Sequence, residues 1–181
     1  ANHILDKAIE SDMSASDNIN DLMLEGGMTV AEKVLEQTGV IGEKIEVSAH
    51  IVEGVQVSSY VHAGNRLATL VGFNNKTDEQ VAKDIAMQVA AMNPLSVDKD
   101  GIDQVTIDRE LEIAKDLARQ EGKPEAMLEK IATGRLNKFY KENTLLNQGF
   151  IKESKKTVSQ YLKEQNGALS VTCFKRIGLG N

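Results

Sequence analysis

The 181-residue sequence predicts an α+β fold: two small α/β subdomains with antiparallel sheets and an inserted antiparallel helical (coiled-coil) hairpin. Three observations support this fold class. Apolar residues recur at helical spacing in several separate segments. Between residues 45 and 73, apolar residues instead alternate with polar ones, as in half-buried strands. Near residue 122, a Glu-Gly-Lys-Pro turn separates two helical patterns, which is typical of an αα-hairpin.

The first subdomain is expected to span residues 1–76 and to open with two helices. Residues 3–9 place apolar side chains on one stripe, and a polar loop follows at residues 11–20. The pattern of a capping box at residues 29–32 begins a second helix, which we expect Gly39 to close. Because the chain starts in helical period and without Met, we expect it to be a fragment of a longer protein.

A three-stranded antiparallel meander is expected to complete this subdomain. Its first strand is the alternating segment 45–51, in which every second residue is apolar. Turns containing Gly54 and Gly64 lead into two further strands, at residues 55–61 and 66–73. The two helices are expected to cover one face of this sheet.

The second subdomain is expected in two pieces, residues 77–106 and residues 145–181. A second capping-box pattern at residues 77–80 begins a helix that Asn93-Pro94 ends. A further helix beginning at Thr157 and a last strand over 169–177 complete this subdomain.

The helical hairpin is expected as an insertion at residues 107–144. Gly122 can adopt the positive φ that ends a helix, and Pro124 suits the first turn of the next helix. The two arms are expected to meet along a narrow apolar stripe, formed by Ile107, Leu111, Ala114, Ala118, Leu128, Ile131 and Phe139.

Composition excludes several classes of function. A net charge of -6 argues against direct nucleic-acid binding, which needs a basic surface. Cys173 is the single cysteine, so an internal disulfide is excluded, and a cytoplasmic protein is indicated. No apolar run is long enough to span a bilayer, so no membrane interaction is expected.

The sequence supplies no catalytic set. His50 and His62 fall on neighbouring predicted strands, but no acidic or thiol residue is spaced to complete a metal site with them. We interpret them as exposed or hydrogen-bonded histidines, and Cys173 as a small apolar core residue. No phosphate-binding glycine loop is present, so no nucleotide or other cofactor is expected. The hairpin carboxylates are typical of a solvated face, and Lys152, Lys155 and Lys156 of a solubilising cluster or a local acidic-partner site.

Five segments carry a resemblance to a known family: GEKIEVSAHIVEG, SYVHAGNRLATLVGF, AKDIAMQVAAMNP, EGKPEAMLEKIATGRLNKF and FIKESKKTVSQYL. In this order, the chain resembles bacterial elongation factor Ts, the guanine nucleotide exchange factor of elongation factor Tu. The resemblance implies an N-terminal helical module, a core of two subdomains and a coiled-coil hairpin inserted in the second. It also implies that the two core subdomains bind the nucleotide-binding domain and the third domain of elongation factor Tu.

The resemblance also implies partner-binding residues. The family's RIGVLV segment matches residues 66–71, which gives Arg66, Leu67 and Ala68 as contacts with the nucleotide-binding domain. Gln88 stands where the family has His and would face the third domain, and the family's contact after the hairpin, in QPFV, falls at Phe150 and Ile151. Ala68, Gln88 and Gly149 differ from the family's usual Gly, His and Pro. The alternative interpretation of Leu67 is an ordinary strand residue that fills a core.

The family's exchange mechanism requires no covalent chemistry, so we expect no enzymatic activity. A Phe in a Thr-Asp-Phe-Val motif disturbs the magnesium and phosphate sites of the GDP-bound partner, and the nucleotide-free partner is bound more tightly. Neither that motif nor the N-terminal module is present in these 181 residues. The resemblance therefore predicts a chain that binds elongation factor Tu but accelerates GDP release poorly.

Two other functions stay open. A second hypothesis is a dimerisation or interaction module whose hairpin pairs with a second copy, which would form a homodimer. A small α+β enzyme or ligand-binding domain would need a pocket with converging titratable groups, and the sequence supplies no such set.

Overall fold

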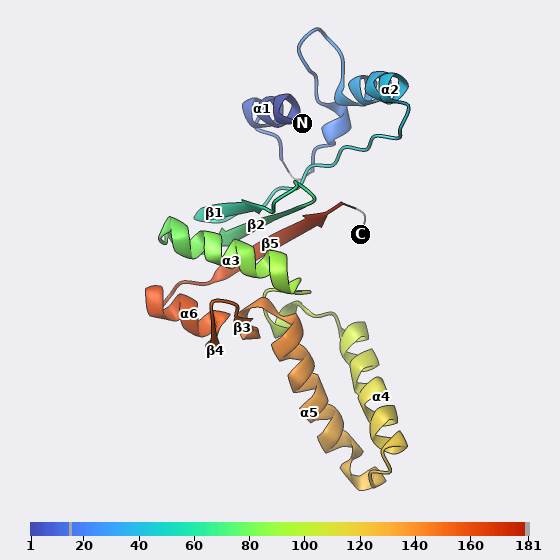
Figure 1. The fold of residues 1–181 in the computed structure, drawn as a ribbon, viewed down its shortest axis with the longest axis vertical. Coiled ribbons are helices and arrows are strands. Elements are labelled where there is room, and N and C mark those ends of the chain that lie inside the picture. The colour runs from blue at the N-terminus through green and yellow to red at the C-terminus, as the bar shows by residue number, and fades with distance from the viewer. Residues whose placement is uncertain (15, 180–181) are drawn as a thin grey trace. The chain divides into compact units, whose positions relative to one another are not determined.

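The computed structural model describes residues 1–14 and 16–179. Its helices and small antiparallel sheets confirm the predicted α+β class (Figure 1). The chain forms two compact units, Ala1–Ile51 and Val52–Asn181, which are considered separately below. Among the described helices, none is both long and apolar enough to cross a membrane.

The first unit contains α1 (Asn2–Glu10), the short 3-10 helix η1 (Ile19–Asp21) and α2 (Val30–Ile41). The predicted capping box is confirmed at the start of α2, because the Thr29 hydroxyl accepts from the Glu32 N–H and the Glu32 carboxylate accepts from the Thr29 N–H. The prediction that Gly39 ends this helix is wrong. The helix continues to Ile41, and Gly42 is the residue that adopts the left-handed conformation, at φ +78°.

The predicted strand at residues 45–51 is absent, and this prediction is wrong. Residues 44–53 belong to no strand, although the side chains of Ile45 and Val47 are half-buried within the first unit. Alternation describes which side chains are apolar, but a strand also needs a hydrogen-bonded neighbour. The third strand of the sheet comes instead from the far end of the chain.

The main sheet of the second unit has the strand order β1-β2-β5, with both pairings antiparallel. The turn between the first two strands is closed by the His62 N–H, which donates to the Leu67 carbonyl at 2.8 Å. Gly64 and Asn65 adopt positive φ there, as the predicted turn requires. The strands are β1 (Gln56–Val61), β2 (Leu67–Phe73) and β5 (Val171–Gly178). The two-subdomain division stays a prediction, and β5, which it assigned to the second subdomain, pairs with β2 of the first.

Helix α3 (Glu79–Met92) packs against β1 and β2 and forms the centre of the core (Figure 1). Its apolar side chains Ile85 and Val89 are fully buried together with Val71 and Phe73 of the sheet. The helix begins at Asp78, whose carboxylate accepts from the Gln80 N–H, so the predicted capping box led by Thr77 is not formed. As predicted, the helix ends at Asn93, which adopts the left-handed conformation at φ 44°.

The hairpin is confirmed as two long helices, α4 (Gln104–Gln120) and α5 (Glu125–Asn143), which lie side by side (Figure 1). Gly122 has φ +72° in the turn between them. Pro124 occupies the N-cap position of α5, one residue before the first turn in which it was predicted, and its side chain makes no capping hydrogen bond. The short 3-10 helix η2 (Lys99–Gly101) precedes α4. Of the predicted stripe, the fully buried side chains are Ala114, Ala118 and Leu128, joined by Ala132, while Ile107, Leu111, Ile131 and Phe139 are half-buried.

The hairpin enters and leaves the second unit through adjoining segments. The Leu95 N–H donates to the Asn143 carbonyl at 2.8 Å, and the Leu145 N–H donates to the Ser96 carbonyl at 2.9 Å. After the hairpin, the chain forms a two-stranded antiparallel sheet and a capped helix. These elements are η3 (Leu145–Asn147), β3 (Gly149–Phe150), β4 (Glu153–Thr157) and α6 (Val158–Gln165).

Candidate partner-binding site

The exposed turn between β3 and β4 is the best-defined candidate site. Its two central residues are Ile151 and Lys152, because Phe150 pairs directly with Glu153 across the turn. Ile151 is 41% exposed and is one of several large aliphatic residues at the surface of the second unit. The turn therefore presents an apolar side chain beside a cationic one.

The side chain of Gln88, on α3, forms hydrogen bonds with the backbone at the start of this turn. Its Oε1 accepts from the Ile151 N–H at 2.8 Å, and its Nε2 donates to the Gly149 carbonyl at 3.1 Å. The Gln88 side chain is fully buried, so its amide satisfies backbone groups that would otherwise be left unpaired. Gln88 is thus placed beside the predicted contact residues but has no surface of its own for a partner.

The same amide network reaches the base of the helical hairpin. Gln88 Nε2 also donates to Gln148 Oε1 at 3.1 Å, and Gln148 Nε2 donates to the Glu142 carbonyl at 2.9 Å in the last turn of α5. Gln148 is itself buried. A continuous chain of buried hydrogen bonds therefore links α5, α3 and the Ile151 turn.

Asp84 holds the second residue of the turn. It lies one helical turn before Gln88 on α3 and is 5% exposed. Its Oδ1 accepts from Lys152 Nζ at 2.7 Å and from Gln80 Nε2 at 2.6 Å. A buried carboxylate requires such partners, and the bond from a lysine ammonium is the stronger, charge-assisted kind.

Phe150 anchors the turn rather than presenting a surface. It is buried and stacks on Tyr161 of α6, with ring centroids 4.1 Å apart and an interplanar angle of 17°. Burial raises the pKa of the Tyr161 hydroxyl above its usual value, and the negative charge of Asp84 raises it further. Of the three residues predicted here, Gln88 and Phe150 form the support and Ile151 forms the exposed point.

Arg66, Leu67 and Ala68 form a second group, at the start of β2. Arg66 is exposed, and its carbonyl accepts from the Leu179 N–H at 2.8 Å. Side chains alternate along a strand, so Leu67 lies on the face with the core residues Thr69 and Val71, while Ala68 lies on the opposite face.

The opposite face of the sheet, near Ala68, is apolar and exposed. Ala68 pairs with Val61 of β1, and Val57 lies on the same face four residues before Val61. Both valines are exposed, because α3 is packed on the other side of the sheet. This second group can therefore contact a partner through apolar side chains.

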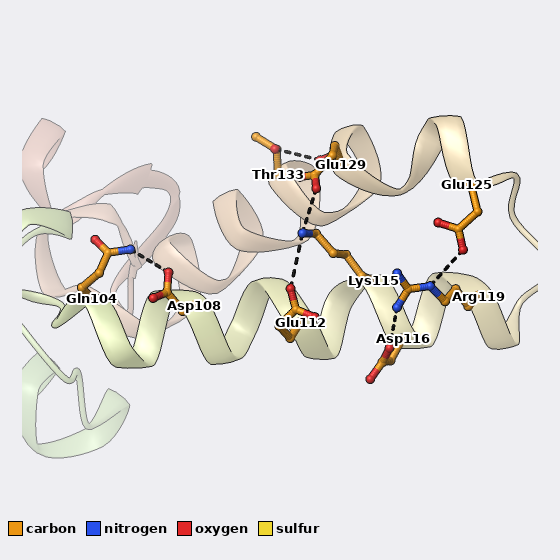
Figure 2. A network of polar contacts seen from close by, with 9 residues as sticks. All are labelled: Gln104, Asp108, Glu112, Lys115, Asp116, Arg119, Glu125, Glu129 and Thr133. Atoms are coloured by element: carbon orange, nitrogen blue, oxygen red, sulfur yellow. Dashed lines mark hydrogen bonds and ion pairs between the residues drawn. The ribbon is translucent and has the colours of Figure 1, made fainter.

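The hairpin surface is polar and carries several ion pairs, as Figure 2 shows. Lys115 contacts Glu112 of its own helix at 3.4 Å and Glu129 of the other helix at 2.8 Å. Arg119 likewise contacts Asp116 at 2.8 Å and Glu125 at 3.1 Å. The hydrogen bond with Glu129 is the largest cause of the raised pKa of Lys115. These contacts join the two arms, which fits the predicted solvated face.

Several of the remaining titratable candidates have partners within the chain. His62 Nδ1 is 2.8 Å from the Tyr60 hydroxyl, and Cys173 Sγ donates to the Glu53 carbonyl at 3.2 Å from a half-buried position. Lys152 and Lys156 of the lysine cluster pair with acidic groups of this chain. In residues 1–14 and 16–179, no three His, Cys, Asp or Glu residues gather as metal ligands would.

Asp84 and Lys152 were not predicted as a site pair. A signal for Asp84 was available, because it interrupts the apolar face of α3 between Val81 and Ile85, where a charged residue needs a partner. The identity of that partner was not available, since Lys152 lies 68 residues further along the chain.

Similarity to known proteins extends over the whole chain. The family described as Elongation factor TS matches residues 1–181. A protein named Elongation factor Ts from Christiangramia forsetii is 52% identical over 157 residues, which are 85% of this chain and 57% of that protein. One of the same name from Porphyromonas gingivalis is 45% identical over 178 residues, 98% of this chain and 65% of the relative. A third, from Cytophaga hutchinsonii, is 44% identical over 180 residues, 97% of this chain and 65% of the relative. The chain thus spans less than two thirds of the length of these relatives.

Proposed function

The chain belongs to the elongation factor Ts family, and we propose on that basis that it binds elongation factor Tu and promotes the exchange of GDP for GTP. The family match over all 181 residues is the observation that carries this proposal. We accordingly propose a role in protein biosynthesis, as a cytoplasmic factor of translation elongation.

The proposed activity needs binding energy rather than a catalytic group. A protein that binds the nucleotide-free state of its partner more tightly than the GDP-bound state must lower the partner's affinity for GDP by the same factor. Exchange then follows because GTP can enter the site that GDP has left. The chain would act by differential contacts with the two states of elongation factor Tu.

Two surfaces of the second unit support this role. We propose that the exposed Ile151 turn contacts the third domain of elongation factor Tu, with Gln88 and Phe150 holding it in place. Arg66 and Ala68 would contact the nucleotide-binding domain, with Leu67 supporting them from the core side of β2. An exposed aliphatic side chain on a well-anchored turn is suited to enter an apolar pocket of a partner.

The strength of exchange is a separate proposal. A polypeptide of residues 1–181 contains no Thr-Asp-Phe-Val segment. We expect this polypeptide to bind elongation factor Tu but to accelerate GDP release weakly.

One experiment tests both proposals. Purified residues 1–181 are titrated into elongation factor Tu loaded with a fluorescent GDP analogue, while binding is measured by calorimetry with and without excess GDP. Binding that weakens as GDP rises, with a small increase in release rate, is the expected result. No binding under either condition would refute the proposed function, and full-rate release would refute the weakened activity alone.

A dimerisation role for the hairpin has one observation in its favour. Ile113 and Leu117, one helical turn apart on α4, are exposed at 46% and 45%. Light scattering of the chain alone, before and after Ile113→Lys, would separate a hairpin-mediated dimer from a monomer.

A further inference from the structure

Two residues of one helix hold the two central residues of the exposed turn. On α3, Gln88 Oε1 accepts from the backbone of Ile151, and Asp84 Oδ1 accepts from the side chain of Lys152. The two helical residues are four positions apart, so they lie above one another on the same face of α3. From this arrangement we infer that Asp84 is a positioning residue, which orients Ile151 for the partner through its ion pair with Lys152.

The turn needs this second support because its own ladder is short. The pairs Gly149–Thr157 and Phe150–Glu153 are the whole of the β3–β4 register, and an irregularity separates them. A ladder this short is weak by itself. The Gln88 hydrogen bond restrains the backbone at Ile151, but the following residue has no such bond from α3 except through its side chain.

The charges at the two ends of the contact differ in environment. Asp84 is almost fully buried, while the side chain of Lys152 is 47% exposed. A buried carboxylate that lost its cation would retain only the Gln80 amide as partner, so the buried end favours keeping the pair closed. The ion pair therefore holds the Lys152 side chain against α3, and Ile151 is the residue that presents an exposed apolar side chain on the turn.

The inference rests on the proposed binding of elongation factor Tu, and a double-mutant cycle tests it. Asp84→Asn removes the charge but keeps a similar shape, and Ile151→Ala removes the exposed side chain. We expect each single variant to weaken binding by about tenfold. If Asp84 acts by orienting Ile151, the double variant should bind within about twofold of Ile151→Ala. Fully additive losses, or an unchanged affinity for Asp84→Asn, would overturn the inference.

A second measurement needs no partner. Amide hydrogen exchange reports the Ile151 N–H, which should exchange faster in Asp84→Asn, while core amides of β2 keep their protection. Lys152→Met breaks the same ion pair from its exposed end and should give the same local change even if Asp84→Asn fails to fold. Unchanged exchange at Ile151 in Lys152→Met would refute the positioning role.

A matched control is available on the hairpin. Asp116 also pairs with a cation, Arg119, but on an exposed surface away from the turn. Asp116→Asn should leave both the affinity and the exchange of Ile151 unchanged. If the unmodified chain does not bind elongation factor Tu, the proposed function fails, and the exchange measurement still decides whether Asp84 positions the turn.

Discussion

The backbone N–H of Ile151 donates a 2.8 Å hydrogen bond to the side chain of Gln88, a residue 63 positions earlier that has no exposed surface. A buried amide thus determines where an exposed aliphatic side chain points. Residues that affect binding by such support need not touch the partner. Gln88 is therefore expected to influence both stability and binding.

Replacing Gln88 tests this support. Gln88→Leu keeps the approximate volume but removes the Gln88 partner of the Ile151 N–H, of Gln148 Oε1 and of the Gly149 carbonyl oxygen, so the free energy of unfolding should fall by about 2 kcal/mol. Urea denaturation measures this change. Gln104→Leu, on the exposed start of α4, is the control and should change stability by less than about 0.5 kcal/mol. Equal effects of the two changes would contradict the support role.

The second surface is tested at Ala68. Ala68→Asp places a charge on the exposed face of the sheet, opposite α3, and should weaken binding to elongation factor Tu by more than about tenfold. Calorimetric titration gives the affinity. Gln165→Asp, at an exposed position of α6, is the control for one added negative charge. An Ala68→Asp chain that binds as tightly as the control would remove this face from the proposed interface.

Gly72 is required by a close approach between two segments. A Cβ at this position would overlap the carbonyl oxygen of Glu53 and lie 3.1 Å from Cys173 Sγ. Gly72→Ala should therefore destabilise the second unit by more than about 2 kcal/mol in thermal or urea unfolding. Gly134→Ala makes the opposite case, because nothing lies within 4 Å of that position in α5, and it should stabilise by about 0.5 kcal/mol. A neutral Gly72→Ala would contradict the packing.

Substitutions at the neighbouring hairpin residues Ala118 and Arg119 should change the free energy of unfolding by very different amounts. Ala118 is fully buried between the arms, so Ala118→Leu should cost about 1–3 kcal/mol through overpacking. Arg119 makes two ion pairs but is exposed, so Arg119→Ala should destabilise the chain much less than Ala118→Leu does. Urea unfolding of both variants compares the two. A larger loss for Arg119→Ala would mean that the ion pairs, and not the alanine seam, hold the arms together.

Local sequence signals predicted the helices well. The capping boxes at Thr29 and Thr157 and the turn at Gly122 depend on residues within four positions of one another, so their geometry is written in short segments. The wrong predictions at Gly39 and Thr77 also concern only a few neighbouring residues. More than one nearby residue can cap or end a helix, and packing selects among them.

The resemblance implied Gln88, Phe150 and Ile151 as partner contacts without saying that they lie together, and the structure brings these three residues together. It did not predict that Gln88 and Phe150 are buried and that only Ile151 is exposed. Which side of a residue faces solvent depends on the segments packed over it. Here those segments are the start of β3, the last turn of α5 and helix α6. All three lie more than 50 residues from Gln88 in the chain.

The amino-acid sequence alone was enough to predict the helices, the inserted hairpin, the α+β class and the family. These features depend on periodicity, helix caps and the order of short motifs. The tertiary structure alone decided that β5, and not residues 45–51, is the third strand of the main sheet, and that Asp84 meets Lys152. Strand pairing and burial of a charge depend on which distant segments come together. That choice is made by the free energy of the whole core, where Val71 meets Phe174 across the sheet.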